Sequence, residues 1–243
     1  MTSPTLALHE ERPSVAVVIV AHPDDADFGP AGTIARWVDA GTVAHLVCCT
    51  SGDAGADDPR TDPLALARLR EAEQRAAAAV VGYASVTFLH HPDGALANDL
   101  VLREQLVRIL RTHRPDAVLT CDPTVVIGSE GYIQHVDHRT AGLAAIDAVY
   151  PAARNAMAFP SLAIHEGLAP HAVGRLYLFW TEQPNAAVDV AATLGRKLDA
   201  LRAHASQLRD PDATLAAVGT WLAEAGAPLG CAAAETFRVL DLR

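Results

Sequence analysis

SVAVVIVAHPDD, residues 14–25, joins an apolar run to a cluster of ionisable side chains. The run carries no charge and is rich in β-branched residues, which predicts a strand buried on both faces of a parallel sheet. Pro23 then breaks the strand and leaves one imidazole and two carboxylates, His22, Asp24 and Asp25, at its C-terminal end. Ligands bind at that edge of open α/β sheets. The pattern therefore indicates half of a metal site better than it indicates packing.

A second cluster, HVDH at residues 135–138, comes more than a hundred residues later and opens an apolar pattern typical of a helix. His22, Asp25 and His138 would together supply three metal ligands and leave one position open. That arrangement is typical of catalytic rather than structural zinc. The alternative interpretations are a surface turn at residues 22–25, since Pro and Asp favour turns, and two solvated histidines at a helix start.

The ionisable side chains left over in the two clusters are expected to handle protons. Asp24 directly precedes Asp25, and neighbouring side chains diverge, so Asp24 cannot easily bind the same metal. A bound metal lowers the pKa of its water toward ~7, and Asp24 could then take the proton. His135 and Asp137 are the other two candidates for proton chemistry.

Strand and helix patterns alternate from residue 14 onward, which predicts βαβ units and a Rossmann-like, mostly parallel sheet flanked by helices. Strands are expected at 14–20, 43–49, 85–89, 117–121, 175–180 and 236–242, and helices at 31–40, 63–81, 99–112, 138–150, 190–205 and 212–225. We expect one domain over 1–243, with a core at 14–150 and a pocket-shaping C-terminal elaboration at 151–243. The tryptophans Trp37, Trp180 and Trp221 are expected in the core.

Composition narrows the possible partners of this chain of 243 residues, which is 50% hydrophobic and 20% charged. The net charge of −10 and the lack of a basic run argue against nucleic acid or an anionic membrane. No apolar run is long enough to span a membrane. Four cysteines without CxxC spacing, and a first segment (1–13) without a basic region, predict a reduced, cytoplasmic protein. The expected partner is a small molecule, and a homo-oligomer is left open.

The chain resembles the LmbE-like, or PIG-L, family of zinc-dependent N-deacetylases. The matching segments come in the family's order: AHPDDADFGPAG (21–32), TSGD (50–53), REAEQRAAAAVVG (70–82), PDG (92–94) and HVDHRTAG (135–142). They span roughly the first 60% of the chain. HPDD after a strand and HxDH later in the chain are fairly specific in combination, and either half alone is weak.

The resemblance implies that Zn²⁺ binds to the three predicted ligands and that Asp24 is the general base. It assigns His135 to the substrate carbonyl, where an imidazolium would stabilise the oxyanion and protonate the leaving amine. Asp137 would then orient or charge His135. The family usually has Pro where this chain has Val136, which should cost rigidity and not chemistry.

Four further residues are expected near the substrate. Arg70 resembles an arginine that faces the pocket in the family, although a surface pairing with a neighbouring glutamate is the alternative. Asp93 follows a strand and could receive a sugar hydroxyl, or could belong to an ordinary Pro-Asp-Gly turn. Tyr132 stands three residues before HxDH, whereas some relatives place a mobile tyrosine two residues before it. His204 resembles a C-terminal family feature that packs near the pocket, and its alternative is a structural role.

The resemblance implies a hydrolase that removes an acyl group, above all acetyl, from the 2-amino nitrogen of a hexosamine-containing small molecule. A mycothiol-conjugate-type amidase is an alternative. Two histidines and one carboxylate also form the facial triad of non-haem Fe(II) oxygenases, but those sites are generally mounted on β-barrels. A non-catalytic Rossmann-like binding module is a further alternative, and it has no GxGxxG after the first strand to support it.

Overall fold

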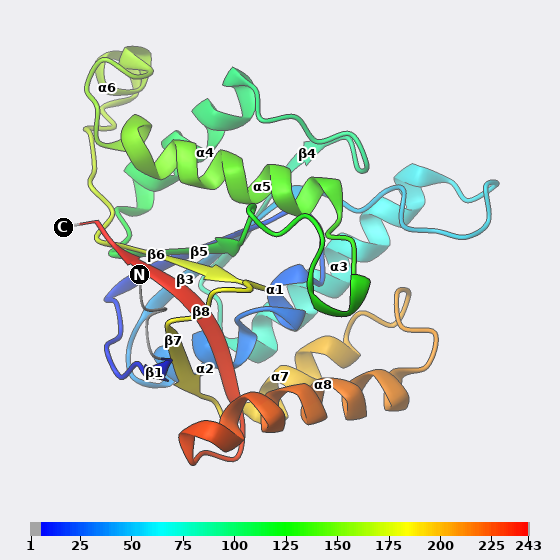
Figure 1. Cartoon of the computed structure of the whole chain (residues 1–243). Helices are drawn as coiled ribbons and strands as arrows, with labels where there is room; N and C mark the ends of the chain where they lie inside the picture. The colour runs from blue at the N-terminus through cyan, green and yellow to red at the C-terminus, as the bar shows by residue number, and fades with distance from the viewer. Residues whose placement is uncertain (1–5, 243) are drawn as a thin grey trace.

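Eight strands form one sheet, in the order β1-β7-β8-β6-β5-β2-β3-β4, in the computed structural model (Figure 1). The structure describes residues 6–242, so residues 1–5 of the first segment lie outside it. The strands are β1 (Ala7–Leu8), β2 (Val15–Val20), β3 (Val43–Thr50), β4 (Ser85–His91), β5 (Ala117–Cys121), β6 (Arg175–Phe179), β7 (Ala186–Asp189) and β8 (Ala234–Asp241). β8 runs antiparallel to β6 and β7, and the other pairs are parallel. The predicted Rossmann-like, mostly parallel sheet is confirmed.

Helices cover both faces of this sheet. They are α1 (Asp25–Phe28), α2 (Ala31–Asp39), α3 (Pro63–Val81), α4 (Leu100–His113), α5 (Val136–Asp147), α6 (Pro160–Glu166), α7 (Leu194–Arg202) and α8 (Pro211–Gly226). The apolar sides of α2, α3, α7 and α8 pack into one core, and those of α4, α5 and α6 pack into the other. Figure 1 shows these two groups of helices on opposite sides of the sheet.

The central strand β2 is buried on both faces, as its composition predicts. Residues 16–21 are fully inaccessible, with Val18 in one core and Val17 and Ile19 in the other. Burial of each such side chain contributes about 1.5–3 kcal/mol. Cys48 and Cys49 on β3 point into opposite cores and are free thiols.

The order of the strands creates the site. The chain passes from β2 outward to β3 and β4, and then crosses to β5 and β6 on the other side of β2. At such a reversal, the loops that follow the two central strands leave a crevice at their carboxyl ends. Residues 22–25 follow β2 and residues 122–138 follow β5, so both ionisable clusters enter the same crevice.

Six features differ from the sequence-based expectation. The two-residue β1, the one-turn α1, the short α6 and the four-residue β7 are additional, because such short elements have too little periodicity to detect. The helix expected at 190–205 is shorter, because a turn at 191–193 delays its start and α7 already ends at Arg202. The helix expected from His138 begins at Val136, because His135 Nδ1 accepts a hydrogen bond from the Asp137 N–H and caps it. No helix within residues 6–242 has the length and apolarity to cross a membrane.

Candidate active site

A cavity of about 730 Å³ opens at the carboxyl ends of β2 and β5, and both ionisable clusters line it. Eight of the ten residues singled out from the sequence line its wall: His22, Asp24, Asp25, Arg70, Asp93, Tyr132, His135 and His138. Asp137 and His204 lie behind that wall. The cavity volume lies within the range of small-molecule sites.

The three predicted metal ligands converge on one point. His138 Nε2 lies 3.0 Å from Asp25 Oδ1 and 3.2 Å from His22 Nδ1. His22 Nδ1 lies 3.6 Å from Asp25 Oδ2. Ligands placed tetrahedrally at zinc–ligand distances of ~2.0–2.2 Å are roughly 3.4 Å apart. The separations within this ligand triangle are therefore close to those around a tetrahedral zinc ion, with Asp25 turning Oδ1 toward His138 and Oδ2 toward His22.

Hydrogen bonds on the far side of each ring fix which nitrogen faces the centre of the triangle. His138 Nδ1 is 3.0 Å from Gln134 Oε1, and His22 Nε2 is 3.0 Å from Asp93 Oδ1. These oxygens can only accept, so both rings donate outward and direct their other nitrogen, the one that a metal would take, toward the centre. Asp25 Oδ2 accepts from the N–H groups of Ala21 and His22. Two imidazole nitrogens and a carboxylate thus face one another, an arrangement that is favourable around a proton or a metal cation.

The charges around the triangle also favour a cation. Burial alone would lower the pKa of His22, but hydrogen bonds to Asp137, Asp25 and Asp93 outweigh it and raise the pKa to about 12. Burial opposes ionisation of Asp25, yet His138 and His22 hold its pKa well below the usual range. A field that retains a proton this strongly also attracts a divalent metal, and the donor set therefore fits zinc.

The surroundings of Asp24 differ from those of its neighbour Asp25. It has φ of +95°, an uncommon conformation for a residue other than glycine. Its N–H donates to Gln74 Oε1 at 2.8 Å, and its Oδ2 lies 3.3 Å from Arg70 Nη2. Burial and then the Asp25 carboxylate raise the pKa of Asp24 to about 6, against the effect of Arg70. Asp24 is thus a carboxylate that can gain and lose a proton near neutral pH.

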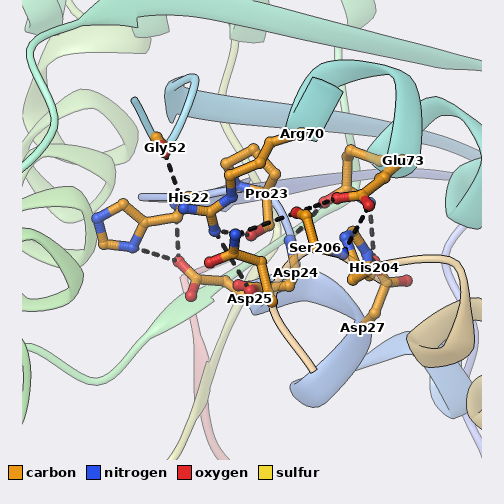
Figure 2. Close-up of polar contacts among 12 residues, drawn as sticks. His22, Pro23, Asp24, Asp25, Asp27, Gly52, Arg70, Glu73, His204 and Ser206 are labelled. Carbon is orange, nitrogen blue, oxygen red and sulfur yellow. Dashed lines mark hydrogen bonds and ion pairs between the residues drawn. The ribbon is translucent and has the colours of Figure 1, made fainter. Parts of the chain in front are cut away.

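Arg70 stabilises the loop that follows β2 through hydrogen bonds. Its guanidinium donates to Gly52 O at 3.0 Å and to Pro23 O at 2.8 Å, and it also contacts Asp24 (Figure 2). It lines the cavity, yet its side chain is only 5% exposed. A Cβ at Gly52 would come within 2.3 Å of the guanidinium, so glycine is required there. The alternative of a surface pairing with a glutamate does not fit this burial.

A buried network supports Asp24 from behind. Gln74 accepts from the Asp24 N–H, and its own amide donates to Asp27 Oδ2 at 2.7 Å. His204 Nε2 lies 2.8 Å from the same oxygen (Figure 2). From the sequence, His204 is expected near the substrate. His204 is 0% exposed and does not line the cavity, so its partner is Asp27 and not a substrate. The C-terminal segment thus reaches the loop that carries Asp24 from inside the protein.

His135 lies beside the ligand triangle, with a ring nitrogen within 4.8 Å of nitrogens of His22 and His138. Its Nδ1 accepts from the Asp137 N–H at 3.2 Å, so the neutral ring carries its proton on Nε2. Partial burial, followed by His22 and His138, lowers the pKa of His135. The ring is therefore mainly neutral near neutral pH before substrate binds.

The carboxylates of Asp93 and Asp137 both contact His22. From the sequence, Asp93 is expected to face a sugar hydroxyl and Asp137 to orient His135. Asp93 Oδ1 contacts His22 Nε2, and Asp93 Oδ2 accepts from the Ala54 N–H at 2.9 Å, although the residue also lines the cavity. The fully buried Asp137 lies 3.4 Å from His22 Nε2 and accepts from the N–H groups of Gly94 and Leu96. Its carboxylate hydrogen bonds therefore orient His22 and the 94–96 loop, while only its backbone N–H holds His135.

Several cavity residues could not be identified from the sequence. Tyr132, 60% exposed, lines the cavity, and so do Trp180 and Trp221; Trp180 is partly buried and also packs against the core that contains Trp37, whereas Trp221 is exposed and not in the core. Gln74 carries a signal, since it lies four residues after Arg70 on the side of α3 that is buried. A polar side chain at a core-facing position indicates a specific partner. For Trp180 and Trp221 we find no such signal.

Comparisons with known proteins agree with this geometry. Diacetylchitobiose deacetylase of Thermococcus kodakarensis is 32% identical over 190 residues, which cover 78% of this chain and 68% of that protein. A deacetylase of Mycobacteroides abscessus, whose substrate is 1D-myo-inositol 2-acetamido-2-deoxy-alpha-D-glucopyranoside, is 29% identical and covers 81% and 82% of the two chains. The structure of N,N′-diacetylchitobiose deacetylase from Pyrococcus horikoshii superposes with a TM-score of 0.86 at 29% identity, covering 94% of this chain and 84% of that one. Residues 17–149 match the family model of PIG-L, GlcNAc-PI de-N-acetylase, and the chain belongs to this family.

Proposed function

We propose that the protein is a zinc-dependent deacetylase that removes the acetyl group from the 2-amino nitrogen of a hexosamine-containing small molecule. The observation that carries this proposal is the separation of tasks within one cavity. His22, Asp25 and His138 bring their ligand atoms to separations close to those around zinc, while Asp24 and His135 line the same cavity beside them. The deacetylase activity of the relatives supports the reaction class.

Zinc held by His22, Asp25 and His138 would polarise the amide carbonyl and lower the pKa of a water molecule. Asp24 is the general base that accepts a proton from the attacking water. Its backbone is held by Gln74, and Arg70 fixes its carboxylate. Because its pKa lies near 6, Asp24 is ionised at neutral pH and can still return the proton to the leaving amine.

His135 stabilises the negative charge that develops on the carbonyl oxygen. The Asp137 N–H fixes the neutral tautomer in which Nε2–H is the donor, so no protonation of the ring is required first. The carboxylates of Asp93 and Asp137 contact His22 Nε2 and keep the ring of His22 oriented. Because His22 follows β2 and Asp93 follows β4, their contact also holds these two loops together. Three buried free thiols, Cys48, Cys49 and Cys121, support a reducing, cytoplasmic setting for the enzyme.

The experiment that tests this function combines metal analysis with product analysis. Zinc-supplemented protein is incubated with N-acetylglucosamine, N,N′-diacetylchitobiose, a GlcNAc–inositol and a mycothiol-type conjugate. Free amine and acetate are both measured, and oxygen consumption is followed in parallel. Equal release of amine and acetate, absent in Asp24→Asn, is the expected result. Release of a different acyl group from the conjugate would favour the amidase, and oxygen uptake coupled to product would refute the hydrolase.

A further inference from the structure

The hairpin at residues 126–134 lies between β5 and α5 and has two faces with different surroundings. Ile127 and Ile133 form an antiparallel bridge in it, flanked by two backbone hydrogen bonds. Successive side chains of an extended strand point to opposite sides. Tyr132 and Gln134 line the active-site cavity, whereas Ile133 between them does not. One face of the hairpin is therefore a wall of the cavity, and the other face, with Ile127 and Ile133, is turned outward.

The outward side of this region exposes a group of large apolar side chains. Ile127 is 69% exposed and Ile133 is 70% exposed, and opposite residues of an antiparallel pair are close neighbours. Val136 and Leu143 on α5 are each about half exposed, and their spacing of seven residues places them on one side of the helix. Val136 follows Ile133 by only three residues, so the two pairs adjoin. These four residues are here called the outer patch, and a contiguous exposed apolar group is typical of an interaction surface.

Arg139 adds a cation to the outer patch. It lies between Val136 and Leu143 on the same side of α5. Its Nε is buried and has no hydrogen-bond partner among residues 6–242. Buried donors are nearly always paired, and arginine is enriched at protein interfaces, where its guanidinium binds carboxylates. The surroundings of Arg139 therefore indicate that its partner lies on another molecule.

The charge of the chain decides which molecule fits the outer patch. With a net charge of −10, two copies repel each other wherever carboxylates of both surfaces meet. The outer patch is uncharged and has Arg139 within it, so two copies can approach each other there. At the hairpin end, Glu182 adds a carboxylate, because its Oε1 accepts a hydrogen bond from the Ser129 N–H at 2.8 Å. An apolar surface with a cation at one end and an anion at the other is complementary to a second copy of itself.

We propose that the outer patch is the contact surface of a homodimer with two-fold symmetry. The axis brings the hairpin of one copy against α5 of the other, so that each Arg139 meets the hairpin end that carries Glu182. The apolar side chains supply the affinity, and the opposite charges fix the orientation. This inference does not depend on the proposed function, because none of these residues takes part in the proposed reaction.

Sedimentation equilibrium of the zinc-supplemented full chain tests the dimer. Wild-type protein should sediment with twice the mass of one chain. Ile133→Asp and Arg139→Glu should each raise the Kd of the dimer at least thirtyfold, the effect of a central interface residue. Leu64→Asp is the matched control, since Leu64 is 68% exposed on α3, on the other side of the sheet, and it should sediment like wild type (Figure 1). Circular dichroism and urea unfolding establish that each variant is folded.

Amide hydrogen exchange locates the contact independently of any variant. In wild-type protein, amides of residues 126–143 should exchange more slowly at high than at low protein concentration, whereas those of α3 should exchange alike. Wild type that is monomeric at about 100 μM, where a dimer with a micromolar Kd is formed, overturns the proposal. A dimer that persists in folded Ile133→Asp also overturns it, because the contact then lies elsewhere. Monomers that float with phosphatidylcholine vesicles would assign the outer patch to a membrane surface and likewise overturn the dimer.

Discussion

Asp24→Asn should stabilise the metal-free protein at neutral pH while it removes the proposed general base. The pKa of Asp24 is raised from 3.8 to about 6, first by burial and then by Asp25. The unfolded chain therefore ionises this group more easily than the folded protein does, and the free energy of unfolding falls as the pH rises from about 4 to 6. A difference of about two pH units is worth ~3 kcal/mol at pH 7. Asparagine cannot ionise, and it tolerates positive φ as well as aspartate does.

Urea unfolding in the presence of a chelator measures this effect. At pH 7 the Asp24→Asn protein should be more stable than wild type by up to ~3 kcal/mol, and the two curves should converge as the pH falls below 4. With zinc added at pH 7, kcat of the variant should fall by roughly 10²- to 10⁴-fold while the zinc content stays the same. A variant that is less stable than wild type at pH 7, or a stability gap that is independent of pH, would refute the reasoning.

Three other outcomes are expected. Alanine at any one of the three predicted metal ligands should abolish both stoichiometric zinc, measured by elemental analysis, and activity; a variant that keeps its zinc would disprove that assignment. Gln74→Leu leaves the Asp24 N–H without a partner and should lower kcat at least tenfold with zinc retained, whereas Glu73→Gln, which weakens the contact with Ser206 beside the network, should keep kcat near wild type. Burial and then the stacked ring of His113, 3.7 Å away, lower the pKa of His45 to about 4. Its stabilising effect is therefore present above pH 6.5 and lost as the pH falls toward 4, and His45→Gln should flatten the pH dependence of the free energy of unfolding in that interval.

The sequence predicts those parts of the fold that depend on local patterns. The buried strand β2 is marked by an unbroken apolar run, and α3 is predicted at 63–81 because Pro63 and Gly82 delimit it. The two ionisable clusters are likewise local, and the strand order brings them together by the general rule for open sheets. For this reason the three ligands and Asp24 could be proposed before any coordinates.

What the sequence does not predict depends on contacts between distant segments. Whether Trp221 is buried or exposed is decided by what packs against α8, and a helical pattern places it no differently from Leu222. His204 could be placed near the site, but its partner Asp27 lies 177 residues away. The protonation of His135 depends on a hydrogen bond from its own cap and on two neighbouring rings. Each of these outcomes is a property of the folded surroundings.

The division of the cavity between two parts of the chain has a consequence for how such enzymes can diversify. The predicted ligands and Asp24 all precede residue 139, whereas Trp180 and Trp221 both follow residue 150. Exchange of α8 would reshape the part of the cavity that Trp221 lines and leave the three predicted ligands in place. The selectivity for substrates can therefore change while the reacting groups stay the same. His204 is the exception, because it joins the later segment, through Asp27 and Gln74, to the loop of Asp24. A chimaera that replaces the C-terminal part must keep this histidine in place to stay active.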